Sequence, residues 1–149
     1  MIGALVLRMT WKRNVEKEFA RRDPDQILKA WADDGVLEFG GTNGMSGRYV
    51  GKEQLRSWVV SWFDRMERID FTVQHVALTR PWAMGLTNTV MYEAHVSETA
   101  HDGTAASTDV VIVDELRRGR LVHERVYLFD ESPDLVMWGP KQQAGPTAA

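Results

Sequence analysis

Three ionisable residues in the second half of the chain have types and spacing suited to proton transfer: Glu93, His95 and Asp114. Glu93 and His95 are two residues apart in a segment that alternates like a β-strand, so their side chains share one face. Burial in apolar surroundings raises the pKa of a carboxyl group, and a neighbouring imidazole can hold it ionised and relay its proton. Such a pair could perform enolisation, aldol cyclisation, dehydration or water activation.

Other interpretations of the same segment remain open. Glu93 and His95 would be solvated if they lie near the end of their strand. A shift of one residue in register would instead place Tyr92 and Ala94 inside. His75, Glu93 and His95 are also residue types that bind metals, but no sequence spacing requires a metal site, and we expect none.

The composition excludes several classes of protein. The chain has 149 residues, 44% hydrophobic and 26% charged, which fits one domain with a sizeable core. The absence of cysteine excludes a disulfide framework and a thiol nucleophile. The net charge of -3 argues against a nucleic-acid partner. No segment reaches the roughly 18 apolar residues of a membrane span. We therefore expect a cytoplasmic protein with neither nucleic acid nor membrane as partner.

The period of the apolar residues changes once along the chain. Trp11, Val15 and Phe19 are spaced by four, which predicts a helix within residues 9–32. Asp23 and Pro24 are typical of the start of a second, short helix. A short strand (36–39), a glycine-rich loop (40–47) and a helix from 51 to 66 follow. Strands are then predicted over 69–75, 84–96, 109–116 and 121–130.

The order of these elements predicts the architecture. Helices followed by strands joined mostly by hairpins are typical of an α+β fold. We expect a strongly bent antiparallel sheet in the shape of a cone, with three N-terminal helices on its concave face and a pocket at the open end. Residues 1–8 are interpreted as an N-terminal extension, 9–139 as the domain and 140–149 as a flexible tail.

Four segments carry a resemblance to a known family: 31–39 (WADDGVLEF), 47–53 (GRYVGKE), 118–122 (RGRLV) and 125–130 (RVYLFD). In this order and spacing the chain resembles the SnoaL-like branch of the nuclear transport factor 2-like superfamily, which is related to ketosteroid isomerases and limonene-epoxide hydrolases. The resemblance implies a cystatin-like α+β barrel and a homodimer formed through the outer face of the sheet. The superfamily includes isomerases, hydratases, epoxide hydrolases, polyketide cyclases and binding modules without activity, so it predicts fold rather than chemistry.

The resemblance also implies which side chains line the cone. It places Glu93, His95 and Asp114 inside, with Glu93 at the acid–base position of the hydrolases. Together with the helical spacing of two tryptophans, it predicts these substrate-binding residues: Phe19, Leu37, Phe39, Trp58, Trp62, Met66, Met91, Ile112, Val126 and Leu128.

The known mechanisms of these relatives are mostly absent from the sequence. The resemblance puts the other four hydrolase residues at Met91, Val126, Leu37 and Phe39, none of which can replace them. The proton-shuttling Asp of the isomerases falls at Phe39, and their oxyanion-hole Tyr falls near Val15. Asp114 would correspond to the second, protonated isomerase Asp only if the hairpin is shifted.

Two further acids are less central to the expected chemistry. Glu124 is interpreted as a rim or interface carboxylate. Glu16 belongs to the helix that faces the cone, but it can equally pair with Lys12 or Arg13 on the helix surface.

The sequence therefore predicts a small cavity protein that needs no cofactor. It would bind a hydrophobic, oxygenated small molecule and act as a cyclase, isomerase or dehydratase, with Glu93 and either His95 or Asp114 moving protons. The first alternative is a ligand-binding or accessory module without activity. The second is an epoxide hydrolase of the limonene-epoxide type with a rebuilt water site.

Overall fold

The computed structural model describes residues 2–80, 82 and 86–142, with side chains described from residue 9 onward. The chain forms four helices and six strands in this order: α1 (Ile2–Arg21), α2 (Pro24–Lys29), β1 (Trp31–Phe39), β2 (Gly47–Val50), α3 (Gly51–Arg65), β3 (Met66–Leu78), β4 (Thr87–Ala100), β5 (Ala105–Arg117), β6 (Arg120–Leu128) and α4 (Ser132–Trp138).

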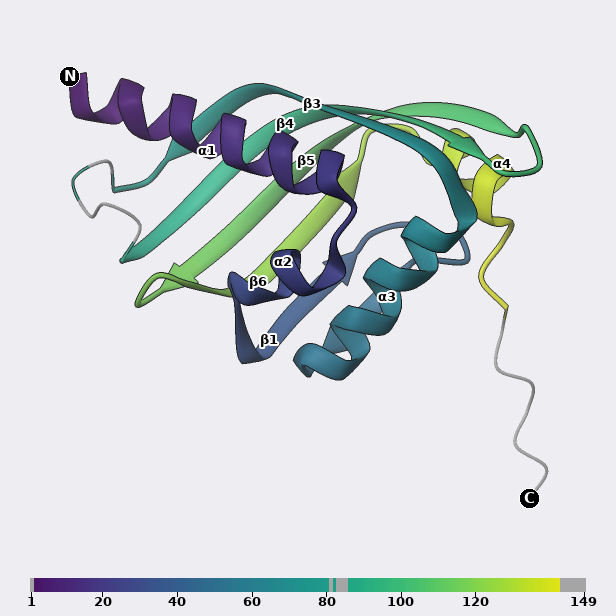
Figure 1. Cartoon of the computed structure of the whole chain (residues 1–149), viewed down its shortest axis with the longest axis horizontal. Helices are drawn as coiled ribbons and strands as arrows, with labels where there is room; N and C mark the ends of the chain where they lie inside the picture. Colours follow the sequence, from purple (N-terminus) through teal and green to yellow (C-terminus); the bar gives the residue numbers. More distant parts are fainter. Residues whose placement is uncertain (1, 81, 83–85, 143–149) are drawn as a thin grey trace.

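The six strands form one curled, unclosed sheet in the order β2-β1-β6-β5-β4-β3. β1 and β6 are parallel, and every other neighbouring pair is antiparallel. Helices α1, α2 and α3 lie across one face of this sheet, and α4 lies at its end (Figure 1). The predicted α+β class and the helices on the concave face are confirmed. A helix long and apolar enough to cross a membrane is not found among the described residues.

Aromatic contacts join α1 to the rest of the core. The ring of Phe19 stacks on that of Phe71 in β3 at a centroid distance of 4.4 Å and meets Trp62 of α3 edge-on at 5.3 Å. One turn earlier, Oε1 of Glu16 accepts a hydrogen bond of 2.9 Å from the backbone N–H of Val73. Glu16 also lies 3.8 Å from Lys12. It therefore fixes α1 against β3 instead of lining the cavity.

The turn between α1 and α2 holds the helices together. Arg22 adopts a φ of 51°, and its guanidinium donates to the carbonyls of Phe63, Met66 and Glu67 at the junction of α3 and β3. The carboxylate of Asp23 accepts hydrogen bonds from the first turn of α2, so the predicted N-cap is confirmed.

Several boundaries differ from those predicted. Helix α1 already begins at Ile2, within the expected extension, and Met66 starts β3 instead of ending α3. Strand β1 begins at Trp31, because it pairs with β6 from Leu121 onward. Strand β2 and helix α4 were not predicted. Met84, the expected start of the strand predicted over 84–96, and residues 143–149 of the expected tail lie outside the described residues.

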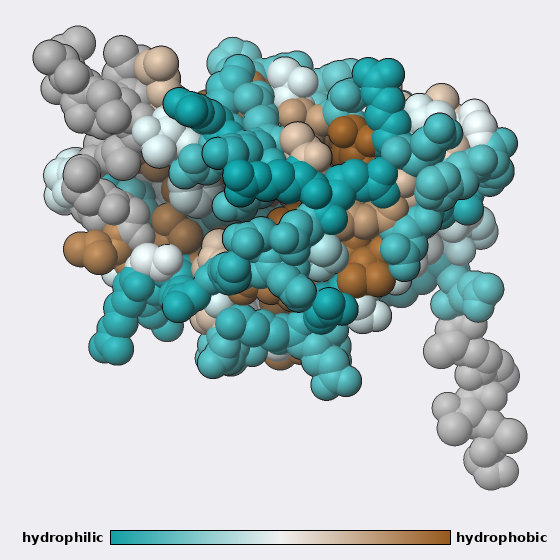
Figure 2. Space-filling view, in the orientation of Figure 1, coloured by the Kyte–Doolittle hydropathy of each residue, from teal (hydrophilic) through white to brown (hydrophobic). Residues whose placement is uncertain are grey.

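The core lies between the helices and the sheet. Its largest fully buried apolar side chains come from five different elements: Leu37, Leu55, Met66, Val73, Val90 and Met137. The helical face of the molecule is mostly hydrophilic at its surface, with hydrophobic residues visible between the polar ones (Figure 2).

Candidate functional site

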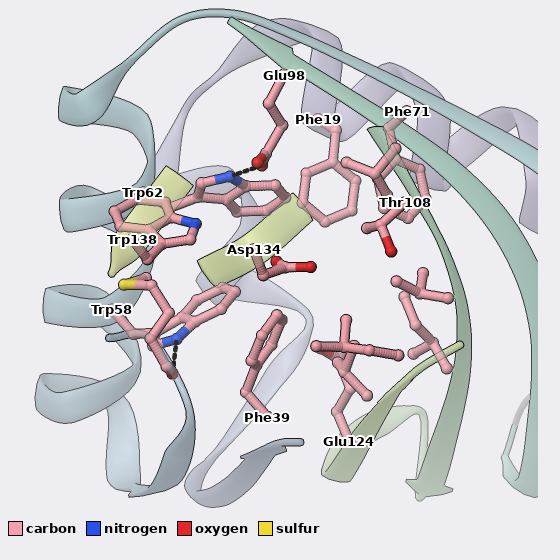
Figure 3. A pocket seen from close by; sticks show the side chains of 16 residues that line it. Phe19, Phe39, Trp58, Trp62, Phe71, Glu98, Thr108, Glu124, Asp134 and Trp138 are labelled. Carbon is pink, nitrogen blue, oxygen red and sulfur yellow. Dashed lines mark hydrogen bonds between the residues drawn. The ribbon is translucent and has the colours of Figure 1, made fainter. Parts of the chain in front are cut away.

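A cavity that is partly open to solvent lies between the helices and the inner face of the sheet. Its wall is mainly aromatic and aliphatic. Seven of the predicted substrate-binding residues line it: Phe19, Phe39, Trp58, Trp62, Ile112, Val126 and Leu128. Four lining residues are polar, namely Glu98, Thr108, Glu124 and Asp134 (Figure 3).

Three predicted lining residues lie elsewhere. Leu37 and Met66 are 2% and 0% exposed and belong to the solid core. Met91 is 44% exposed on the outer face of the sheet, so its predicted placement in the cavity is wrong. Each expectation came from family resemblance, which does not fix the depth or register of a side chain.

Glu93 and His95 also lie on the outer face of β4, so the prediction that they face the cone is wrong. Glu93 Oε2 lies 2.9 Å from Nδ1 of His75, and His95 Nδ1 lies 2.7 Å from Oδ1 of Asp109. The two side chains therefore join separate outer pairs. The physical reason is the apolar set on the other parity of β4, which must be buried: Val90, Tyr92, Ala94 and Val96. The alternative register, with Tyr92 and Ala94 inside, is the one that the structure shows.

The inner acid pair consists of Asp114 on β5 and Glu124 on β6. The two residues are direct neighbours across the antiparallel ladder, and Asp114 is only 2% exposed. Burial, the Glu124 charge and a hydrogen bond to Glu124 raise the pKa of Asp114 well above its usual value. Burial also raises the pKa of Glu124 to about 7, although the hydrogen bond from Asp114 opposes this shift. Asp114 is thus the protonated partner, and Glu124 is the one that faces the cavity.

Tyr92 extends this pair away from the cavity. Its side chain is 4% exposed and lies beside Asp114. Burial, followed by the charges of Asp114 and Glu124, raises the pKa of this phenol well above its usual value, so it remains a donor. Tyr92, Asp114 and Glu124 form a buried cluster, of which Glu124 lines the cavity wall.

Two other acids form the α4 end of the cavity, together with Trp62: Glu98 on β4 and Asp134 on α4. Glu98 accepts a hydrogen bond from the indole N–H of Trp62, yet burial raises its pKa to about 7. Burial and the Glu131 charge raise the pKa of Asp134 to about 6. The carboxyl group of Asp134 points toward the middle of the cavity (Figure 3).

The sequence did not single out Tyr92, Glu98 or Asp134 as site residues. It indicated a rim or interface role for Glu124, whose side chain lines the cavity. A signal for Tyr92 and Glu98 was present, because both share the parity of the apolar residues Val90 and Val96. Asp134 carried no such signal, since the helix that holds it was not predicted.

The cavity wall contains no lysine, arginine or histidine among the described residues. In the same part of the chain, no group of three or more His, Asp or Glu side chains has a geometry that could hold a metal ion. The site is therefore an apolar chamber with acidic groups at two places, suited to hold an organic molecule and to exchange protons with it.

Comparisons with known proteins agree with this geometry. Residues 12–124 match the SnoaL-like domain family. Among curated proteins, none matches the chain at significant similarity.

Solved structures with the same fold are numerous. A nuclear transport factor 2-like protein of unknown function from Burkholderia pseudomallei has a TM-score of 0.70 at 18% identity, over 87% of this chain and 95% of that one. A candidate isomerase from Bacillus subtilis has a TM-score of 0.70 at 19% identity, over 94% and 99%. A protein from Catenulispora acidiphila with a ketosteroid isomerase-like fold, solved with trimethylamine, has a TM-score of 0.61 at 17% identity, over 78% and 82%. These likenesses establish the fold. The family match, which spans residues 12–124, shows that this chain belongs to the SnoaL-like domain family.

Proposed function

We propose that the cavity binds a hydrophobic, oxygenated small molecule and that Glu124 transfers protons on it, with Asp114 as its positioning partner. The observation that carries this proposal is the carboxyl pair of Asp114 and Glu124 beside an apolar cavity. Of these two residues, Glu124 is the one that lines the cavity. A general base works best when its pKa lies near the working pH, and burial raises that of Glu124 to about 7.

The chemistry that suits this pair is isomerisation, cyclisation or dehydration next to a carbonyl group. The Glu124 carboxylate would remove a proton from the carbon beside the carbonyl and return it at another position. The Asp114 carboxyl donates a hydrogen bond to Glu124 and so limits its basicity. Tyr92, which does not line the cavity, is the other polar neighbour of Asp114. All of these steps use side chains alone, and the proposed reaction needs no cofactor.

The comparisons support this class of reaction only through the fold. A structural neighbour from Bacillus subtilis is a candidate isomerase, and its fold is similar to that of this chain. The finer proposals are our own: a cytoplasmic enzyme, a homodimer through the outer sheet face and a substrate of the polyketide, terpenoid or steroid kind.

The test begins with binding. A thermal-shift panel of steroids, terpene epoxides, enones and aromatic polyketides at tens of micromolar would identify the preferred class. A ligand at about 100 times its dissociation constant adds about 2.7 kcal/mol to the stability of the folded state. A shift by one class supports a binding cavity, whereas no shift across the panel contradicts the proposal.

Turnover of the compound found would then be compared in two variants. Glu124→Gln keeps the shape of the side chain and removes the base, so turnover should fall about 100-fold or more while binding persists. Glu93→Gln is the matched control, because Glu93 lies on the outer face beside His75. Loss of turnover in Glu93→Gln would contradict the role of Glu124. Binding without turnover in the wild type would favour the accessory module.

A further inference from the structure

The α4 end of the cavity contains two acidic side chains, Asp134 and Glu98, that take no part in the proposed proton transfer. Asp134 is 6% exposed, and its Oδ2 has no hydrogen-bond partner among the described residues. Within the part of the chain that the structure describes, the side chain of Glu98, the second acid there, is hydrogen-bonded only to the indole of Trp62. A buried carboxylate without a partner is costly unless it is neutralised. The free oxygen of Asp134 is therefore available to a group that a ligand brings into the cavity.

The charged groups around Asp134 do not compensate it. Glu98 faces it from β4, and Glu131 and Asp130 precede it on the chain; all three are acidic. Arg65 of α3 has other partners: it donates a 3.0 Å hydrogen bond to the carbonyl of Met137 and pairs with Asp102 at 3.4 Å. Its guanidinium lies over the ring of Trp138, 5.7 Å from the centroid. The cavity side of Asp134 thus has negative surroundings.

Aromatic rings form the wall beside these acids. The rings of Trp58 and Trp62 lie 5.5 Å apart and inclined at 54°, and both line the cavity. Their polar atoms are already occupied, since Trp58 Nε1 donates to the carbonyl of Met45 and Trp62 Nε1 donates to Glu98. Only the π-systems of these two rings remain for a ligand. The face of an indole attracts a cation, and the attraction grows when the site is removed from water.

We propose that the α4 end of the cavity is a subsite for a cationic nitrogen, a protonated or quaternary amine, held between Asp134 and the rings of Trp58 and Trp62. This inference rests on the proposed function, because the same hydrophobic molecule would carry both the amine and the carbon acted on by Glu124. It names the substrate class: an apolar, oxygenated amine. Without that ligand, Asp134 takes up its proton below about pH 6 and Glu98 below about pH 7, because burial raises the pKa of both groups.

The test uses two probes that differ in one atom. In 3-hydroxyphenyltrimethylammonium a quaternary nitrogen stands where 3-tert-butylphenol has carbon, so size and apolar surface are matched. Titration calorimetry on the full chain at about pH 7.5 should show at least about tenfold tighter binding of the cation. At about pH 5.5 the preference should shrink, because Asp134 and Glu98 are then mostly protonated, and binding between these values should release protons. The quaternary nitrogen itself does not titrate.

Variants locate the subsite. Asp134→Asn should remove the preference for the cation and leave the affinity for the neutral phenol within about twofold. Asp64→Asn is the matched control, since Asp64 is exposed on α3, and it should keep the preference. Equal or tighter binding of the neutral probe by the wild type would overturn the cation subsite while leaving a hydrophobic cavity in place. A preference that survives in Asp134→Asn and disappears in Glu124→Gln would also overturn it, because the cation would then sit at the inner acid pair. Failure of both probes to bind would also overturn the cation subsite. The proposed function is tested independently by the thermal-shift panel described above.

Discussion

Carboxyl groups on the two faces of the sheet differ in their partners and in their burial. On the outer face, Glu93 and Asp109 each lie within 3 Å of a histidine. Glu115, on the same face, is bonded to Arg125. On the inner face, Asp114 and Glu98 have no basic partner among the described residues, and burial raises the pKa of both.

This contrast shows that environment, and not residue type, separates the two sets. The outer acids have the partners that a sequence pattern suggests for acid–base chemistry, but they are solvated pairs of the kind that contribute little energy. The inner acids have no such partners, and their unusual proton affinity is what makes them candidates for function. The following predictions test that contrast, from the largest expected effect to the smallest.

The pH dependence of stability should reveal an inner acid. Glu98 has a folded pKa raised from 4.5 to about 7, so the folded state binds more protons than the unfolded state between these values. The contribution of this proton to the free energy of unfolding is complete below about pH 4.5. It is lost as the pH rises through about 7, a change on the order of 3 kcal/mol. The free energy of unfolding of Glu98→Gln, measured with urea, should therefore increase relative to that of the wild type between about pH 5 and pH 8. Parallel pH profiles for the two proteins would show that Glu98 titrates normally.

Truncation of neighbours on β4 should separate the faces by packing. Val90 is 1% exposed, and Val90→Ala should lower the free energy of unfolding by about 2 kcal/mol through lost contacts and a cavity. Met91 is half-exposed, and Met91→Ala should change it by less than about 0.5 kcal/mol. Denaturant midpoints of both variants give the answer. A larger loss of stability in Met91→Ala than in Val90→Ala would favour the alternative register, in which Met91 lines the cavity.

An outer pair should have the smallest effect. Asp109→Asn removes the partner of His95 and should cost less than about 1 kcal/mol at low salt. In about 1 M NaCl the difference from the wild type should disappear, because exposed charges are screened. A larger cost that persists in high salt would mean that the outer pair is as shielded as the inner acids.

The sequence was sufficient for the class of fold and for much of the cavity wall. The four-residue spacing of Trp11, Val15 and Phe19 and the later change to a period of two are direct consequences of one buried face per element. Asp23 could be placed as an N-cap because capping depends only on neighbouring residues.

The acids could not be placed by the same reasoning. The side of the sheet that a strand residue faces reverses with a shift of one position, and the resemblance favoured the parity of Glu93 over that of Tyr92. The apolar content of the Tyr92 parity would have given the observed register. Asp134 depends on where a short terminal helix folds back over the cavity, and local sequence does not specify this contact.

The most direct test of the account is the titration of Glu124 itself. Carbon-detected NMR of the side-chain carboxyl groups, assigned by comparison with Glu124→Gln, would follow its ionisation from about pH 4 to pH 9. We predict a midpoint near the value of about 7 that burial produces, with Asp114 still protonated at that point. A midpoint near the ordinary value of 4.5 would mean that Glu124 is a solvated carboxylate, and it would contradict the central claim that the inner acid pair is built for proton transfer.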